Sequence, residues 1–71
     1  RVRRTIDAIL DQFSDEEGWV SSGVLGDQMA KRLPDFDVRN FGFRKLTSFV
    51  KSLGDYEHAA QGKQIYFRAR S

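Results

Sequence analysis

The sequence predicts an α+β fold of the winged-helix type, with three to four helices followed by a C-terminal β-hairpin that forms the wing. Two observations support this prediction. Apolar residues recur at helical spacing in three segments, and Gly18, Pro34 or Gly54 follows shortly after each of them. After Gly54 the pattern changes to strand-like alternation around a glycine turn. In such a fold the third helix and the hairpin form one continuous surface.

The first two helices are expected from Val2 to Phe13 and over residues 22–32. Ser21 or Ser22 caps the second, because either hydroxyl can accept a hydrogen bond from a free backbone N–H. Gly26 inside it indicates either close packing or a merely tolerated glycine. The expected buried sides are Val2, Ile6, Ile9, Leu10 and Phe13 in the first helix and Val24, Leu25, Met29, Ala30 and Leu33 in the second.

The third helix is expected to begin at Phe43 and to end at Leu53, after a short turn that Asp37 caps. Its apolar face is Phe43, Leu46, Val50 and Leu53, with Phe49 at the edge, and its opposite face is Arg44, Ser48 and Lys51. Exposed aromatic rings are costly in so small a domain. The aromatic residues expected in the core are therefore Trp19, Phe36, Phe41 and Phe43.

The hairpin is expected to pair residues 56–60 with residues 64–69 around Gln61, Gly62 and Lys63. Glycine supplies the positive φ that a tight turn needs. Side-chain alternation places Ile65 and Phe67 inward and Tyr66, Arg68 and Arg70 outward.

Length and composition indicate a single domain over residues 1–71. Cysteine is absent, which excludes disulfides and thiolate metal sites. With no membrane-spanning run and no secretory signal, the protein is expected to be soluble and cytoplasmic. Because the chain begins with Arg1 and not with methionine, it is expected to be a module of a longer protein.

The charge is divided unequally between the two halves of the chain. Residues 1–37 hold five Lys/Arg against eight Asp/Glu, a net charge of −3, whereas residues 38–71 hold seven against two, a net charge of +5. If the halves present separate surfaces, a polyanion would bind the second half.

Catalysis within this chain is not expected. His58 is the only histidine and has no cysteine or second histidine to form a nucleophilic or metal-binding pair. Glycine-rich phosphate-binding loops are absent. We therefore expect a binding module without a cofactor or a metal.

Nucleic-acid binding is favoured because cations, hydroxyls and an aromatic residue coincide in the third helix and the wing. We expect phosphate contacts from the cations and base stacking on Tyr66. The candidate RNA-binding residues are Arg39, Arg44, Lys45, Lys51, Lys63, Tyr66 and Arg68. Two alternatives stay open at this point: a winged helix that binds duplex DNA, and a protein-interaction or dimerisation module that uses the acidic side around Asp7, Asp11 and Asp27.

Several stretches together resemble the LOTUS domain, also called OST-HTH. The family signature F-D-x-R-x-aromatic-G-aromatic-x-K-L is matched from Phe36 to Leu46. Further matching stretches are Gly18-Trp19-Val20, Leu25-Gly26, Leu33-Pro34-Asp35 and Ile65-Tyr66-Phe67-Arg68. The signature is largely a folding signature, so it leaves open whether Arg39 and Lys45 bind RNA or support the fold.

The resemblance implies a winged-helix fold and RNA binding, with a preference for guanine-rich and quadruplex-forming RNA. Bacterial members commonly follow a NYN-type ribonuclease domain, which implies an effector nuclease in the same chain. Animal members with an additional C-terminal helix bind the DEAD-box helicase Vasa. Because this chain resembles the minimal form that ends after the last strand, a Vasa-type helicase is not an expected partner.

Overall fold

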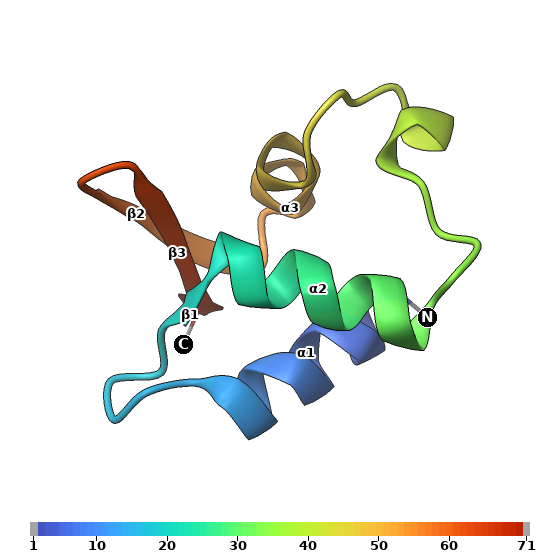
Figure 1. Ribbon diagram of the computed structural model, residues 1–71. Helices are drawn as coiled ribbons and strands as arrows, with labels where there is room; N and C mark the ends of the chain where they lie inside the picture. Colours follow the sequence, from blue (N-terminus) through green and yellow to red (C-terminus); the bar gives the residue numbers. More distant parts are fainter. Residues whose placement is uncertain (1, 71) are drawn as a thin grey trace.

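The computed structural model describes residues 2–70 and contains the predicted helices and hairpin (Figure 1). The two ends of the expected domain, Arg1 and Ser71, lie outside the described residues. The elements in order are α1 (Val2–Phe13), β1 (Val20–Ser21), α2 (Ser22–Arg32), the 3₁₀ helix η1 (Val38–Phe41), α3 (Leu46–Leu53), β2 (Tyr56–Gln61) and β3 (Gln64–Ala69). The α+β winged-helix prediction is confirmed.

The hairpin belongs to an antiparallel sheet with the strand order β1-β3-β2. β2 pairs with β3 from Tyr56↔Ala69 to Gln61↔Gln64, so that Gly62 and Lys63 form a two-residue turn. Gly62 has a φ of 63°, as this turn requires. The short strand β1, which the sequence pattern did not predict, pairs Val20 with Phe67 on the other edge of β3.

The core lies between the three helices and the inner face of this sheet. Phe67 of β3 is fully buried and packs with residues from α1, α2 and α3. The buried residues are Ile6, Ile9, Leu10, Val20, Leu25, Met29, Phe49, Val50, Tyr56 and Phe67. Alternation along β3 therefore points Phe67 inward and its neighbours Tyr66 and Arg68 outward, as expected.

Three residues expected on buried helix faces are exposed. Leu25 and Met29 form the buried stripe of α2, which leaves Val24 and Ala30 outside it. Phe13 is the last residue of α1, beyond the buried turn of Ile6, Ile9 and Leu10, and 44% of its surface is exposed. A fixed helical period overstates burial here, because each helix contacts its neighbours over only part of its length.

The third helix begins later than the sequence pattern predicts. α3 starts at Leu46, and Lys45 precedes it in an extended conformation with a φ of −131°. Gly42 ends η1 in the left-handed conformation, with a φ of 86°. The chain changes direction at this glycine, so Arg44 and Lys45 lie on a connecting segment and the expected helical face of Arg44, Ser48 and Lys51 does not exist.

Aromatic residues from the η1 region surround Phe49 of α3, which is buried and not at the edge of the helix face. Its ring centroid lies 5.4 Å from Phe36, 5.2 Å from Phe41 and 5.7 Å from Phe43. The prediction that Phe41 is a core residue is wrong, since 54% of its surface is exposed. Phe36 and Phe43 are half-buried and pack against the core. The prediction that Trp19 is a core residue is wrong, since its half-buried ring lies under the Arg68 guanidinium and does not pack against the core.

Helices α2 and α3 approach each other closely at Gly26. A Cβ atom built on this glycine would lie 3.4 Å from Leu46 Cδ2. The helices therefore pack closely at Gly26, in line with one of its two interpretations, although a methyl group there would meet only the flexible end of the Leu46 side chain.

The Ser21 side chain caps α2 by accepting a hydrogen bond from the Val24 N–H at 3.2 Å. We expect Ser21→Ala to lower the free energy of unfolding by about 1 kcal/mol, because a backbone donor loses its partner. In a domain of this size that lowers the Tm by about 4–8 °C, which a thermal melt measures. Ser22→Ala is the matched control, because Ser22 is already helical and its side chain does not cap α2. Equal melting of the two variants would contradict this assignment of the cap.

Tyr56 links the start of the hairpin to α1 by donating a hydrogen bond from its hydroxyl to Asp7 Oδ1 at 2.8 Å. Burial, followed by this bond, raises the pKa of Tyr56 above its ordinary value of 10.0. Above that pH the unfolded chain releases a proton that the folded chain retains, so stability falls as the pH rises.

Urea unfolding at pH 8 and pH 11 checks this pH dependence. From pH 8 to pH 11, the free energy of unfolding of the unmodified protein should fall by up to about 1.4 kcal/mol more than that of Tyr56→Phe. The variant has no phenol to ionise at this position. The two proteins share all other titrating groups, so the difference between their losses isolates Tyr56. Parallel losses would show that the hydroxyl is not held in the protonated form.

Candidate nucleic-acid interface

The seven candidate RNA-binding residues occupy three separate places in the fold. Arg39, Arg44 and Lys45 belong to η1 and to the segment that joins it to α3, with Lys51 on α3 itself. Lys63 is at the turn of the hairpin. Tyr66 and Arg68 are on the outer face of β3. The structure therefore brings some of the candidates together and separates others.

The cations around α3 are exposed and unneutralised. Helix α3 packs through Phe49 and Val50, which leaves Lys51 on the solvent side. Within residues 2–70, no carboxylate lies within ion-pair distance of Arg44, Lys45 or Lys51. Their full charge is available to a ligand.

Lys63 extends this basic region along the wing. α3 contacts β2, so the hairpin rises beside α3 and its tip stands out from the helical body (Figure 1). Lys63 is exposed at that tip, and no carboxylate of residues 2–70 pairs with it. A six-residue strand spans about 20 Å, so a ligand that contacts both α3 and Lys63 must be extended or broad.

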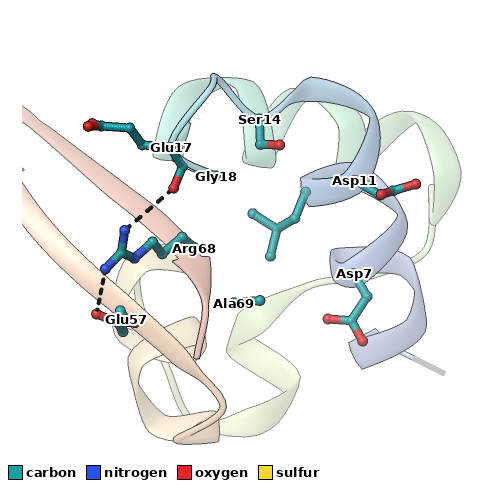
Figure 2. A pocket seen from close by; sticks show the side chains of 9 residues that line it. Asp7, Asp11, Ser14, Glu17, Gly18, Glu57, Arg68 and Ala69 are labelled. Atoms are coloured by element: carbon teal, nitrogen blue, oxygen red, sulfur yellow. Dashed lines mark hydrogen bonds and ion pairs between the residues drawn. The ribbon is translucent and has the colours of Figure 1, made fainter. Parts of the chain in front are cut away.

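Tyr66 and Arg68 face away from the helices, because Phe67 between them points into the core. Arg68 is held by several partners: its Nη2 lies 3.3 Å from Glu57 Oε1, and its Nη1 donates to the Glu17 carbonyl oxygen at 3.4 Å. Its guanidinium carbon also lies 4.6 Å from the centroid of the Trp19 ring. Figure 2 shows the first two contacts: the pair with Glu57 joins the two strands of the hairpin, and the bond to Glu17 ties the hairpin to the loop before β1. Of these two residues, Arg68 is thus occupied by partners within the domain, whereas the cations around α3 are not.

Arg39 is also paired. Its Nε lies 3.2 Å from both carboxylate oxygens of Asp37, and its Nη2 lies 3.0 Å from Oδ2. Asp37 Oδ1 in addition accepts from the Arg39 backbone N–H at 2.9 Å and caps η1, as predicted. The side-chain bonds from Arg39, followed by the backbone bond, lower the pKa of Asp37 below its ordinary value. Although the Arg39 side chain is 79% exposed, its charge is balanced within η1.

Carboxylates gather between α1 and the sheet, away from the helix α3. A hollow of about 490 Å³ between α1 and the end of the sheet is lined by Asp7, Asp11, Glu17 and Glu57, with Arg68 at its edge (Figure 2). Asp7 is engaged by Tyr56 and Glu57 by Arg68. Asp11 and Glu17 keep their charge without an ion-pair partner among residues 2–70, so a polyanion is less favoured here than near the unpaired cations around α3.

Two features of the surface were missed by sequence reasoning. The Trp19–Arg68 contact depends on the pairing of β1 with β3. β1 has only two residues, which is too short for a strand to be recognised from side-chain alternation. The exposure of Phe41 follows from the left-handed turn at Gly42, and the aromatic-glycine-aromatic step was the only sequence signal for it.

The helices were also compared with the dimensions of a membrane. No helix among residues 2–70 has the length and apolarity needed to cross one.

Comparison with known proteins assigns the family. The OST-HTH/LOTUS domain matches residues 1–65. No curated protein and no solved structure is significantly similar to the chain. The match covers the helices, the basic segment before α3 and most of the hairpin. The chain therefore belongs to the OST-HTH/LOTUS family, whose domains are noncatalytic binding modules that generally bind RNA.

Proposed function

We propose that this domain binds RNA without catalysis through a basic surface made of Arg44, Lys45, Lys51 and Lys63. The observation that carries the proposal is the distribution of ion pairs. These four side chains have no carboxylate partner within residues 2–70. Four further cations are paired: Arg3 with Asp55, Lys31 with Asp27, Arg39 with Asp37 and Arg68 with Glu57. Arg4, Arg32 and Arg70 also make no ion pair among the described residues, but they lie on α1, at the end of α2 and after β3, outside α3 and the hairpin turn. Unpaired cations attract phosphates and release their condensed counterions on binding.

We further propose that the preferred ligand is guanine-rich or quadruplex-forming RNA. The eight-residue helix α3 is only about 12 Å long, and the hairpin follows it directly. A helix this short is poorly suited to insert deeply into the groove of a duplex. A broad cationic surface with a projecting wing suits a ligand that presents a tetrad face or closely spaced phosphates. The family assignment supports the RNA part of this proposal and not the guanine preference.

In the parent protein the domain would hold RNA for an effector, for which a NYN-type ribonuclease domain is our candidate. Its own contribution would be binding, as in the family to which it belongs.

Two other ligands are outcomes that the test distinguishes. Sequence-specific duplex DNA binding needs side chains that read base edges, and the exposed side of α3 offers Ser48 and Lys51 but no Asn or Gln. A basic protein partner would instead use the acidic hollow, with Asp11 and Glu17 as its unpaired carboxylates.

The test is a binding panel of guanine-rich RNA, scrambled RNA of the same length and random duplex DNA, each at two salt concentrations. We expect the guanine-rich RNA to bind most tightly and every affinity to fall with salt, because phosphate contacts release counterions. Preference for the duplex would overturn the RNA assignment, and equal binding of both RNAs would overturn the guanine preference.

Two lysine variants locate the surface within the same panel. Lys51→Ala should weaken RNA binding several-fold and reduce the slope of log K against log salt by about 0.7–0.9, the value for one lost phosphate contact. Lys31→Ala is the matched control, because it removes the same charge from an exposed position on α2 that already pairs with Asp27 at 3.3 Å. If both variants change the slope equally, the effect is net charge and not the surface around α3.

Arg68 was among the expected RNA contacts, and its partners predict a different result. Arg68→Ala removes the cation–π contact to Trp19 and the pair with Glu57, so we expect a loss of about 0.5–2 kcal/mol in unfolding free energy. Because Trp19 is the single tryptophan, its fluorescence should report the change directly. The salt slope of RNA binding should stay that of the unmodified protein. If Arg68→Ala instead reduced the salt slope of RNA binding and left the free energy of unfolding unchanged, Arg68 would belong to the RNA-binding surface.

A further inference from the structure

Phe41 is the most exposed of the large apolar residues of the described chain, although it belongs to a ring cluster. Its centroid lies 5.8 Å from Phe36 and 5.2 Å from Phe49, which holds the ring in place from the core side. The remaining 54% of its surface faces solvent. A flat aromatic surface that is fixed behind and open in front is what a nucleobase requires for stacking.

A groove next to Phe41 has room for such a base. It measures about 570 Å³ and lies at the junction of α2 and η1, where its lining includes Phe36, Phe41, Pro34, Asn40, Asp35, Asp37 and Arg32. Because two carboxylates and one guanidinium line it, the groove suits a base better than a phosphate. The Asn40 amide and the Asp35 carboxylate can bond to base amino and carbonyl groups, whereas Asp35 would repel a phosphate placed in the groove.

Two cations that closely follow Phe41 in the sequence favour a polyanionic ligand over an apolar protein segment. Arg44 and Lys45 follow Phe41 by three and four residues, so the Cα atoms of Phe41 and Arg44 lie no more than about 11 Å apart. Neither cation has a carboxylate partner within the described chain. An apolar partner would leave these charges unpaired at its boundary, and a nucleotide strand would neutralise them with its phosphates.

We propose that Phe41 stacks on an unpaired nucleobase, with its phosphates held by Arg44 and Lys45. The proposal rests on the RNA-binding function stated above and adds to it a requirement for single-stranded nucleotides. Stacking adds affinity without a phosphate contact. Loss of the ring should therefore weaken binding and leave its salt dependence unchanged, whereas loss of a cation should change both.

The test compares Phe41→Leu, Phe41→Trp and the unmodified chain on a short single-stranded RNA that carries one 2-aminopurine and on a length-matched RNA duplex. Leucine keeps apolar contact with Phe36 and Phe49 but has no flat ring, and tryptophan keeps the ring. We expect Phe41→Leu to weaken single-strand binding about 5- to 100-fold with an unchanged salt slope, and Phe41→Trp to retain it. The 2-aminopurine fluorescence should be quenched with Phe41 or Trp at this position and not with Leu.

Phe13→Leu is the matched control, because Phe13 is also an exposed phenylalanine, 44% exposed, but lies on the acidic side at the end of α1. It should bind both RNAs as the unmodified chain does. Binding and quenching by Phe41→Leu equal to those of the unmodified chain would overturn the proposal while leaving RNA binding intact. A dimer in sedimentation that only Phe41→Leu abolishes would also overturn it, because the ring would then be an interface between copies. Absence of RNA binding by the unmodified chain would instead remove the proposed function itself.

Discussion

The left-handed backbone at Gly42 is the constraint on which the functional side of this domain depends. The Gly42 N–H donates to the Arg39 carbonyl at 3.1 Å, and the Phe43 N–H donates to the Val38 carbonyl at 3.1 Å. These two bonds reverse the chain, so that Phe43 packs toward Phe49 while Phe41 stays at the surface. A side chain at Gly42 would meet no atom within 4 Å, so the requirement for glycine is its φ of +86° and not space. The same reversal delays α3 until Leu46 and leaves Arg44 and Lys45 on an extended segment.

The fold pairs some of the cations with carboxylates and leaves those around α3 and the hairpin turn without a partner among residues 2–70. Arg3 pairs with Asp55 across the α1 and hairpin segments, and Arg68 joins β3 to β2 and to the loop before β1. Exposed ion pairs of this kind each contribute only about 0–1 kcal/mol. Their larger effect is on the surface potential, because they neutralise the cations near the carboxylates and leave the basic surface around α3 and the hairpin tip uncompensated.

Most of the fold was predictable from the sequence because its signals are local. The periods of α1 and α2, the proline after α2 and the glycine turn of the hairpin each act within a few residues, and the structure confirms their elements. The start of α3 was not predictable in this way. Phe43 has the helical phase of Leu46 and Val50, yet its N–H is bonded to Val38 inside the preceding turn. The partners of Arg68 were not predictable either, because they depend on β1 pairing with a strand more than forty residues later.

The candidate site was predictable in composition but not in geometry. The concentration of cations after residue 37 is a property of the sequence, and which of them remain unpaired is a property of the fold. Among residues 2–70, the side chains of Arg44, Lys45 and Lys51 make no ion pair, so the fold does not depend on their charge. Arg68 differs, since the same guanidinium that carries the charge also connects three segments. Binding and stability are therefore separable around α3 and coupled on the outer face of the sheet. This separation is what a binding surface built on a small, marginally stable domain requires, because ligand contacts that also supported the core would be disturbed each time a ligand was exchanged.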